Sequence, residues 1–433
     1  MKTYDKYKET EYQWIGSIPI NWETKRIKFV CSDIFPGATP STDKKEYWDG
    51  NIPWVPSGCC HDCDVNEAPK YITELGLQNS STRIIPANTT IIALTGATCA
   101  QLGYLTINSC ANQSVVAFVE NKKKAYSKFL FYALRAARSS ILTSQTGGAQ
   151  AGINVEDCKN IILAFPPLEE QRVIADFLDA KTAELDKEKE NLLNQMELLK
   201  VLKSSVITKA VSGGLRGERD SYESRLFGIS IPKDWTVKQL KFALSGIQDG
   251  THGTFERIAE GKLLLSAKNI AEDGIEIGDN EAHISEDDYR GIISNGYPQK
   301  GDIAICCVGT IGRCCLYEFD QPLAFQRSVT FLRPNRDHFA KFLLYVLRSN
   351  LVSSQLEKNK KTATISGIYM GDIAQLMIPV PPLAEQKQIA TYLDSRTAQI
   401  DEQIALQEQQ IQLIEELKQS IISQAVTGKI KVI

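Results

Sequence analysis

The sequence predicts a mixed α+β fold in which two similar globular domains are separated by two long helices. Three observations support this prediction. The chain of 433 residues is 43% hydrophobic and 23% charged, which is the balance of an ordinary globular protein. Its second half repeats the motifs of its first half in the same order. Each half closes with a long stretch that has an apolar residue at nearly every seventh position, the spacing of a helix that pairs with another helix.

The repeat identifies two copies of one large unit. Motifs of the first half recur 213 to 215 residues later, and this period is far too long for a solenoid protein. The motifs keep one order through most of both halves, so chance is a poor explanation. The matching segments are Ile18–Trp22 with Ile231–Trp235, Lys25–Phe29 with Lys238–Phe242, Phe129–Tyr132 with Phe342–Tyr345, Pro166–Gln171 with Pro381–Gln386, and Ala210–Gly213 with Ala425–Gly428.

Each copy begins with a globular domain of mixed helix and strand. The β-branched and aromatic runs Thr90–Leu94, Ser114–Val119 and Ser328–Leu332 predict strands. The segments Ser127–Arg138 and Phe339–Leu347 predict helices. A compact α+β domain with much loop is therefore expected in each copy.

Two stretches of these domains lack a regular apolar pattern. Residues Pro36–Pro56 and Gln248–Gly261 contain many turn-forming residues, and we expect both to be surface loops. Loops on a rigid scaffold commonly carry recognition residues. Both stretches are therefore candidates for contact with a ligand.

A long helix is predicted after each globular domain. The Pro-Pro pairs before the heptad stretches are tolerated in the first turn of a helix, and glycines after the stretches end it. The apolar stripe predicts that the two helices pair as an intramolecular antiparallel coiled coil, with a domain at each end in a pseudo-twofold arrangement. The predicted boundaries are 1–165 and 214–380 for the domains, and 166–213 and 381–433 for the helical spacers. The seam residues are Leu178, Leu185, Leu192, Leu199, Val206, Leu393, Ile400, Ile414 and Ile421.

Charge and composition exclude several classes of function. The net charge is −3, which argues against a DNA-binding domain that acts alone, because such domains are usually basic. No apolar run approaches the roughly 20 residues of a membrane span. The polar start Met1–Lys6 lacks the apolar core of a signal peptide. The eleven cysteines are scattered, so we expect reduced thiols in a cytoplasmic protein without a membrane partner.

The sequence lacks the motifs of the common catalytic classes. The chain has no Gly-x-x-x-x-Gly-Lys-Ser/Thr nucleotide loop, and its four histidines are scattered. Asn51–Trp54 is the nearest approach to the Asn/Asp-Pro-Pro-aromatic motif of a methyltransferase, but isoleucine stands where that motif needs proline. We therefore expect no catalytic residue in this chain.

Two cysteine clusters have the residue types of a metal site. Cys59–Cys63 holds several ligand types at tight spacing, and Cys306, Cys307, Cys314 and Cys315 have four thiols. The second cluster lies in apolar, strand-like runs, where cysteine acts as a small buried hydrophobe. We expect no metal at either cluster.

Taken together, these motifs resemble the specificity (S) subunit of type I restriction–modification systems, the HsdS family. The resemblance covers nearly the whole chain. It rests on Pro-Pro-Leu-x-Glu-Gln followed by an apolar helix and Leu-Asp, on the closing segments Ile207–Gly213 and Ile422–Gly428, and on the two Ile-Pro-x-x-Trp openings. Asn51–Gly58 and Val308–Arg313 also resemble recurring segments of that family.

The resemblance implies a DNA reader without catalytic activity. The domains 1–165 and 214–380 would be target-recognition domains, and each would bind one half of a bipartite asymmetric site on double-stranded DNA. The helices would set the separation of the half-sites and dock two methyltransferase subunits, and translocase–nuclease subunits would join for restriction. S-adenosylmethionine, ATP and Mg would belong to those partners, with no cofactor in this chain. Partner subunits would also clamp the DNA, which makes the acidic average charge less surprising.

Aligned loops of the two domains supply the candidate DNA contacts. Turn hydroxyls and backbone amides suit phosphates, lysine and arginine suit phosphate or guanine, and carboxamides suit adenine. For each residue the alternative of a purely structural role in a turn stays open. The basic run Lys122–Lys124 is interpreted as a solvated turn rather than a DNA contact. The candidates are Thr39, Ser41, Ser57, Thr95, Thr98, Gln113, Thr251, His252, Lys268, Asn269, Thr310, Arg313, Gln326 and Arg327.

Two other functions compete with DNA reading. A coiled-coil scaffold with two ligand-binding domains, and no role with nucleic acid, would show the same helices. A stand-alone DNA methyltransferase or nuclease is disfavoured by the missing motifs. Mapping of methylated sites in the host genome discriminates DNA reading from the scaffold alternative.

Overall fold

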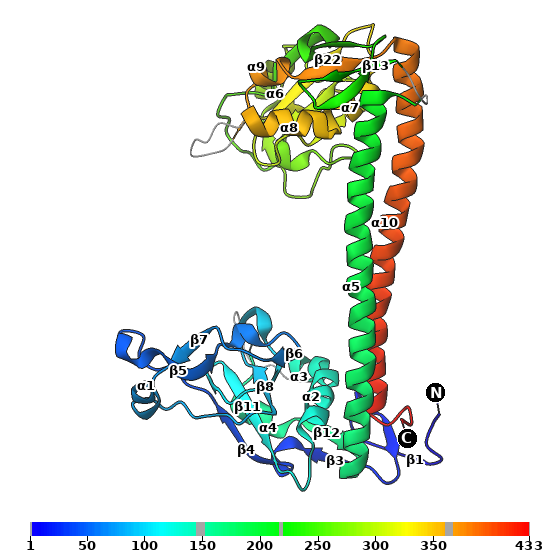
Figure 1. The fold of residues 1–433 in the computed structure, drawn as a ribbon. Helices are drawn as coiled ribbons and strands as arrows, with labels where there is room; N and C mark the ends of the chain where they lie inside the picture. Colours follow the sequence, from blue (N-terminus) through cyan, green and yellow to red (C-terminus); the bar gives the residue numbers. More distant parts are fainter. Residues whose placement is uncertain (1, 144–151, 216–219, 360–366, 433) are drawn as a thin grey trace. The chain divides into compact units, whose positions relative to one another are not determined.

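The chain folds into two compact units, each of which contains one globular part and one segment of each long helix (Figure 1). Unit 1 consists of Met1–Leu192 with Gln409–Ile433, and unit 2 consists of Leu193–Glu408. The computed structural model describes residues 2–143, 152–215, 220–359 and 367–432.

The globular part of unit 1 is built on a five-stranded sheet. In spatial order its strands are β4 (Cys31–Pro36), β11 (Val115–Glu120), β8 (Thr89–Ala93), β9 (Leu102–Leu105) and β6 (Cys63–Val65). All neighbours are antiparallel except β9 and β6. Ile92 and Phe118 pack with helix α2 (Ser127–Ala136), whereas the alternate residues Ile91 and Ala117 belong to a separate apolar cluster. Both faces are thus buried, which explains why β8 and β11 contain consecutive apolar residues instead of an alternating pattern.

A smaller sheet shows that the prediction of a surface loop over Pro36–Pro56 is wrong in its second half, since Trp48–Val55 form a strand, whereas residues 37–44 contain no helix or strand. This sheet consists of β10 (Cys110–Ala111), β5 (Trp48–Val55) and β7 (Lys70–Ile72), with helix α1 (Glu74–Gln78) beside it. Residues 49–51 have the composition of a turn, but here they form an irregularity inside β5, since Trp48 and Ile52 both stand opposite Ile72. Asp49 accommodates the irregularity with a φ of 59°. Such a bulge lets a strand continue through residues that usually end one.

Two ribbons and two helices complete the globular part of unit 1. The ribbons are antiparallel pairs, and the second of them leads into the central long helix. The elements are β1 (Tyr7–Glu9) with β2 (Ser17–Pro19), β3 (Glu23–Arg26) with β12 (Ile162–Phe165), α3 (Arg138–Thr143) and α4 (Val155–Asn160).

Unit 2 repeats this topology with one strand fewer in its main sheet. The main sheet has the order β16 (Leu244–Asp249), β22 (Val329–Pro334), β19 (Ile303–Cys306) and β20 (Cys314–Leu316). The smaller sheet has the order β18 (Ala282–Ile284), β17 (Lys262–Leu265) and β21 (Ala324–Phe325). The ribbons and helices are β13 (Ser221–Ser224) with β14 (Ile229–Pro232), β15 (Thr236–Gln239) with β23 (Met377–Val380), α6 (Glu286–Ile293), α7 (Ala340–Arg348), α8 (Asn350–Asn359) and α9 (Met370–Ala374). The predicted duplication is therefore confirmed in the order of the strands, and β16 takes only the first two residues of the predicted loop Gln248–Gly261.

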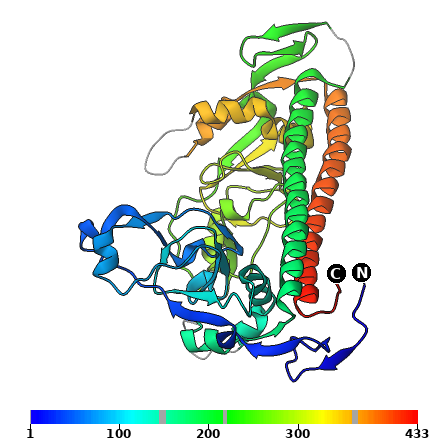
Figure 2. The same ribbon diagram turned by 60° about the horizontal axis from the view of Figure 1, so that its bottom comes forward.

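The two predicted long helices are α5 (Leu168–Gly213) and α10 (Leu383–Val426). In both units their segments lie side by side, as the two views in Figures 1 and 2 agree. Each is followed by a glycine with positive φ, Gly214 at 73° and Gly428 at 71°, a backbone conformation that commonly terminates helices. No helix in the described part of the chain is long and apolar enough to cross a membrane.

Apolar contacts confirm the predicted helix pairing inside each unit. In unit 1, Leu178 and Leu185 share a buried cluster with Ile414 and Ile421, and Leu192 packs at its margin. In unit 2, Leu393 shares a cluster with Ile207, with Val206 at its margin, and Ile400 is also buried while Leu199 is half-buried.

Polar contacts fix the antiparallel register of the helices. In unit 1, Lys189 Nζ lies 2.7 Å from Glu415 Oε1, and Asp186 accepts a hydrogen bond from Lys418. In unit 2, Lys203 Nζ lies 2.8 Å from Asp401 Oδ1. Residue numbers rise along one helix as they fall along the other, which defines antiparallel pairing.

The Pro-Pro-Leu-x-Glu-Gln motif fastens each long helix to its globular part. In unit 1 the buried Gln171 accepts a hydrogen bond from Tyr126 N at 2.9 Å. Its Nε2 donates to the carbonyl oxygens of Lys124 (3.1 Å) and Pro166 (3.0 Å). Gln386 takes the same position in unit 2. One carboxamide thus satisfies three backbone groups where a loop, a proline pair and a helix meet.

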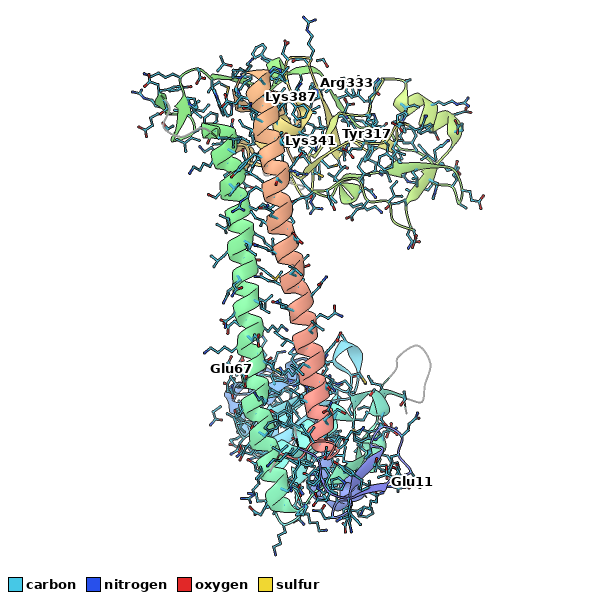
Figure 3. The ribbon with its side chains drawn as sticks, turned by 90° about the vertical axis from the view of Figure 1, so that its right-hand side faces the viewer. Glu11, Glu67, Tyr317, Arg333, Lys341 and Lys387 are labelled. Atoms are coloured by element: carbon cyan, nitrogen blue, oxygen red, sulfur yellow. The ribbon has the colours of Figure 1, made fainter. Side chains whose placement is uncertain are left out.

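A tyrosine–aspartate contact forms a second joint between globular part and helix. Tyr132 OH donates to Asp179 Oδ1 at 2.6 Å, and Tyr345 OH donates to Asp394 Oδ1 at 2.8 Å. Burial raises the pKa of Tyr345 to about 12, so its hydroxyl keeps the proton that it donates. Lys341, labelled in Figure 3 next to α10, lies 2.7 Å from the other oxygen of Asp394. These contacts hold each globular part in one orientation on its own helix segment.

Candidate nucleic-acid interface

In unit 1, three loops come together at one edge of the main sheet. β4 and β8 both pair antiparallel with β11, so their carboxyl ends share an edge with the amino end of β11. Pro36 stands opposite Val116, and Ala93 stands opposite Val115. We call this surface the loop edge of unit 1, and the segments that leave it are residues 37–42, 94–99 and 112–114.

The loop edge of unit 1 collects the candidate residues of the first domain. Thr39 Oγ1 donates a hydrogen bond to Gln113 Oε1 at 2.5 Å, which joins two of them directly. A bond from Asn112 N to the Val55 carbonyl oxygen brings the end of β5, and with it the turn at Ser57, to the same edge. The side chains of Thr39, Ser41, Thr95 and Gln113 are exposed, and those of Ser57 and Thr98 are half-buried.

A glycine lets two chain segments approach closely at this edge in both units. A Cβ atom at Gly37 would lie 2.2 Å from the carbonyl oxygen of Ala111. A Cβ atom at Gly250 would lie 2.3 Å from the carbonyl oxygen of Gln326. No side chain tolerates contacts this short, so only glycine fits. The first loop of each edge is therefore held against the neighbouring strand in the same way.

Unit 2 forms the equivalent loop edge. β16 and β19 both pair antiparallel with β22, with Asp249 opposite Thr330 and Cys306 opposite Val329. The parallel pairing of β17 with β21 brings a fourth turn to this edge, and Ala267 N bonds to Ser328 Oγ at 3.1 Å. The segments at the loop edge of unit 2 are residues 250–255, 266–269, 307–312 and 326–328.

Backbone bonds join three candidates at the loop edge of unit 2. Arg327 N donates to the Thr251 carbonyl oxygen at 2.9 Å, and Thr251 also forms an isolated bridge with Gln326. The exposed His252 follows directly, with Nε2 3.7 Å from Asp249 Oδ2. The side chain of Arg327 is exposed as well, so this edge presents an imidazole and a guanidinium.

Lys268 and Asn269 are adjacent candidates with different positions. Asn269 is only 3% exposed, and its carboxamide accepts a bond from Ser266 N while donating to the Glu276 carbonyl oxygen and to Glu281 Oε1. The structure thus contradicts the predicted base contact by Asn269, because folding already uses its amide to hold the turn. Lys268 is exposed, but its Nζ lies 2.8 Å from Glu281 Oε2, and this hydrogen bond holds the pKa of Glu281 below its ordinary value. A carboxylate beside the lysine weakens its attraction for a phosphate.

Thr310 and Arg313 border a cleft of about 750 Å³ inside unit 2. Both side chains are exposed, and the cleft is also lined by α5, which contributes Lys200 and Lys203. These two lysines were not predicted from the sequence. They are polar positions in an apolar heptad stretch, and that pattern does not show which loop lies beside them.

The cysteines predicted to be buried hydrophobes are buried. Cys306, Cys307, Cys314 and Cys315 lie on or next to β19 and β20. Burial raises the pKa of Cys314 to about 11 and that of Cys315 to about 12, so these thiols stay protonated, whereas metals bind the thiolate. Among the residues that the structure describes, no group of three or more His, Cys, Asp or Glu is placed to hold a metal ion.

Two similar α+β units with matching loop edges, each with a segment of both long helices, define a protein built from two copies of one domain. The sequence pattern of the type I restriction modification DNA specificity domain matches residues 19–197 and 258–416. The chain therefore belongs to the family of type I restriction–modification specificity subunits.

Relatives and solved structures agree with this assignment. The chain is 27% identical to the type I restriction enzyme MjaVIII specificity subunit of Methanocaldococcus jannaschii, over 98% of this chain and 97% of the relative. It is 35% identical to the EcoKI specificity subunit of Escherichia coli K12, over 47% of this chain and 40% of the relative. A solved chain from work on assembly and conformational transition of a type I restriction–modification system shares the fold, with a TM-score of 0.71 and 18% identity over 94% of this chain and 98% of that one. The HsdS subunit of Thermoanaerobacter tengcongensis gives a TM-score of 0.53 at 18% identity, over 95% and 98% of the two chains.

Proposed function

We propose that this specificity subunit is non-catalytic and that each of its units reads one half of a bipartite, asymmetric DNA site. The observation that supports this most strongly is the convergence of candidate residues at one loop edge in both units, with different side chains in each. Unit 1 presents hydroxyls and a carboxamide, from Thr39, Ser41 and Gln113, whereas unit 2 presents His252 and Arg327. Different donors and acceptors select different bases, so the two half-sites need not match.

We divide the proposed DNA contacts of each loop edge into phosphate contacts, which position the DNA, and base contacts, which read its sequence. The exposed hydroxyls of Thr95 and Thr310, each in a turn that follows a strand, suit phosphate oxygens. The amide of Gln113 is held by Thr39 and suits adenine, and the guanidinium of Arg327 suits guanine or phosphate. The remaining candidates lie at or beside the same edges, and we propose that they contact the DNA backbone or make secondary contacts to DNA. They are Ser57, Thr98, Thr251, Lys268, Arg313 and Gln326.

An exposed leucine pair repeats on the two long helices. Leu198 and Leu202 on α5 correspond to Leu413 and Leu417 on α10, 215 residues later, and one pair belongs to each unit. Leu198 is 68% exposed and Leu413 is 62% exposed. Large apolar side chains four residues apart share one face of a helix, and a repeated exposed apolar face favours a protein contact. In this proposal the two pairs dock two methyltransferase subunits, one on each unit.

The chemistry of the complex belongs to partner subunits in this proposal. The methyltransferase subunits bind S-adenosylmethionine, and translocase–nuclease subunits use ATP and Mg for restriction. The paired helices set the separation of the half-sites, about one turn of DNA or roughly 34 Å. A net charge of −3 then fits a reader whose partners complete the clamp on the phosphates.

The substitution Arg327→Ala tests the reading role in the complex reconstituted with methyltransferase subunits. Loss of one guanidinium contact to guanine is expected to weaken specific binding about 10- to 100-fold in a gel shift, with a smaller loss on unrelated DNA. Arg225→Ala is the matched control, because Arg225 is exposed in the turn between β13 and β14. Equal binding by the Arg327 variant and the control removes Arg327 from the reading set. Lys268→Ala is expected to cost less, because Glu281 already shares its charge.

The double substitution Leu198→Glu and Leu202→Glu tests the docking role of the helices. Two carboxylates on an apolar contact are expected to prevent co-purification of one methyltransferase subunit per chain. Asn194→Glu adds a charge at another exposed position of α5 and is expected to have no effect. Retention of both methyltransferase subunits by the double variant contradicts the role of this pair.

The scaffold alternative predicts that DNA binding is absent from the wild-type complex.

A further inference from the structure

An exposed phenylalanine occurs at the same place in both units. Phe29 ends the short 3-10 turn Ile27–Phe29, and Phe242 lies in the equivalent turn Leu240–Ala243, 213 residues later. Phe29 is 59% exposed and Phe242 is 60% exposed. A single exposed apolar side chain needs no explanation. An exposed phenylalanine that recurs at the same position in two units with different loop edges does need an explanation.

The fold holds both phenylalanines outward by matching contacts. The residue two positions before each of them, Ile27 or Leu240, is fully buried and anchors the turn. The carbonyl oxygen of Phe29 accepts a bond from Lys124 Nζ at 3.1 Å. The carbonyl oxygen of Phe242 accepts one from Asn335 Nδ2, also at 3.1 Å. The turn is therefore fixed from both sides, and the ring remains in solvent.

These turns lie at the end of the main sheet opposite the loop edge. The turn of unit 1 precedes β4, whose first residue Cys31 stands opposite Glu120 at the end of β11. In unit 2, Leu244 at the start of β16 stands opposite Pro334 at the end of β22. The loop edges lie at the other ends of these strands. If a DNA half-site binds at the loop edge, the phenylalanine lies at the opposite end of the sheet, away from the DNA.

Cations accompany both rings. Lys28 Nζ lies 5.7 Å from the ring centre of Phe29, and Lys241 Nζ lies 5.0 Å from that of Phe242. The loop after β11 adds the exposed Lys122 and Lys123 in unit 1, and the loop after β22 adds Arg336 beside Asp337 in unit 2. The basic run Lys122–Lys124, predicted from the sequence to be a solvated turn, therefore lies beside the turn that carries the exposed Phe29. An acidic segment with an apolar side chain complements this combination.

We propose that Phe29 and Phe242, with the cations beside them, form a docking site that a methyltransferase subunit uses once per unit, through an acidic segment that carries an apolar side chain. The repeat supports a partner present in two copies, since such a partner meets the same surface twice. Each unit also carries one exposed leucine pair, so one copy of the partner has two contact surfaces on its unit. This inference rests on the proposed function, which supplies the twice-bound partner.

The test uses the full chain co-expressed with its cognate methyltransferase subunit and examined by native mass spectrometry and titration. Phe29→Ser is expected to weaken one of the two binding events about 30-fold, the loss typical of a central aromatic contact. The double variant Phe29→Ser and Phe242→Ser is expected to weaken both. Phe319→Ser is the matched control, because Phe319 is an exposed phenylalanine of unit 2 that lies outside the turn Leu240–Ala243.

The outcomes separate the inference from the function on which it rests. If the wild-type chain binds no methyltransferase subunit, the proposed partner is wrong and so is its docking site. If the wild type binds two copies and the double phenylalanine variant binds two with unchanged affinity, only the docking site is wrong. The variant Lys122→Glu with Lys123→Glu addresses the alternative occupant. Weaker partner binding that depends on salt supports the proposal, whereas intact partner binding with reduced DNA affinity assigns the patch to nucleic acid and overturns it.

Discussion

Removal of the Gln386 side chain is expected to destabilise unit 2 without changing any surface residue. Its carboxamide is 1% exposed and accepts a hydrogen bond from Phe339 N at 2.9 Å. Its Nε2 donates to the Pro381 carbonyl oxygen at 3.0 Å and to the Asp337 carbonyl oxygen at 3.5 Å. Gln386→Ala deletes all three bonds at the point where α10 joins the globular part.

The size of the effect follows from the groups that lose their partners. A buried polar group left without a hydrogen bond costs roughly 1–3 kcal/mol. The amide of Phe339 and the carbonyl of Pro381 are two such groups, whereas the bond at 3.5 Å is long and contributes little. The free energy of unfolding of unit 2 should therefore fall by about 2–6 kcal/mol.

Native-state hydrogen exchange read by mass spectrometry measures this loss, because it reports the opening of each unit from its own peptides. Peptides of unit 2 should exchange faster, and peptides of unit 1 should not. Gln171→Ala should give the reverse pattern, since Gln171 makes the equivalent bonds in unit 1. Gln388→Ala is the control, because Gln388 lies two residues further along the same helix and is exposed. A loss below about 0.5 kcal/mol for Gln386→Ala, the range of ordinary surface substitutions, would refute the reasoning.

Three further predictions concern thiols, pH and the helix seam. Iodoacetamide at pH 8 should label the exposed Cys63 and spare the buried Cys315, because burial raises the pKa of Cys315 to about 12. Labelling of both thiols at one rate in a mass-spectrometric time course would contradict the burial of Cys315. Burial and the nearby Lys238 lower the pKa of His338, so the unfolded chain binds a proton at higher pH than the folded one. Stability of unit 2 should therefore fall as the pH drops below about 7, and His338→Gln should flatten this slope in urea titrations; an unchanged slope would assign it to other groups. Ile414→Ala should lower the stability of unit 1 by about 2–4 kcal/mol in the same titrations, and a negligible loss would mean that the seam is not packed.

The elements that were predicted correctly are marked by patterns in their own stretch of sequence. The stripe from Leu178 to Val206 repeats every seven residues, and this periodicity alone predicts a paired helix. The apolar run at Val115–Phe118 predicts a strand because both faces of that strand are covered. The internal repeat then transfers each assignment from one half of the chain to the other.

The errors arise where tertiary contacts override local composition. Residues 49–51 resemble a turn, yet pairing with Ile72 keeps them inside β5. Asn269 has the side chain of an adenine reader, but its amide is used by Ser266 and Glu281 within its own turn. No local pattern distinguishes an amide that faces a loop from one that faces solvent. Individual DNA contacts therefore stay predictions, whereas the convergence of loops follows from strand register.

The central claim is that each unit reads its own half of one DNA site, and mapping of methylated adenines in the host genome tests it most directly. Deletion of this chain should erase a single bipartite motif. A chimera that takes residues 1–165 from a relative should change only one half of that motif and keep its spacing. An unaltered set of methylated sites after deletion, or a change in both halves in the chimera, would contradict the account.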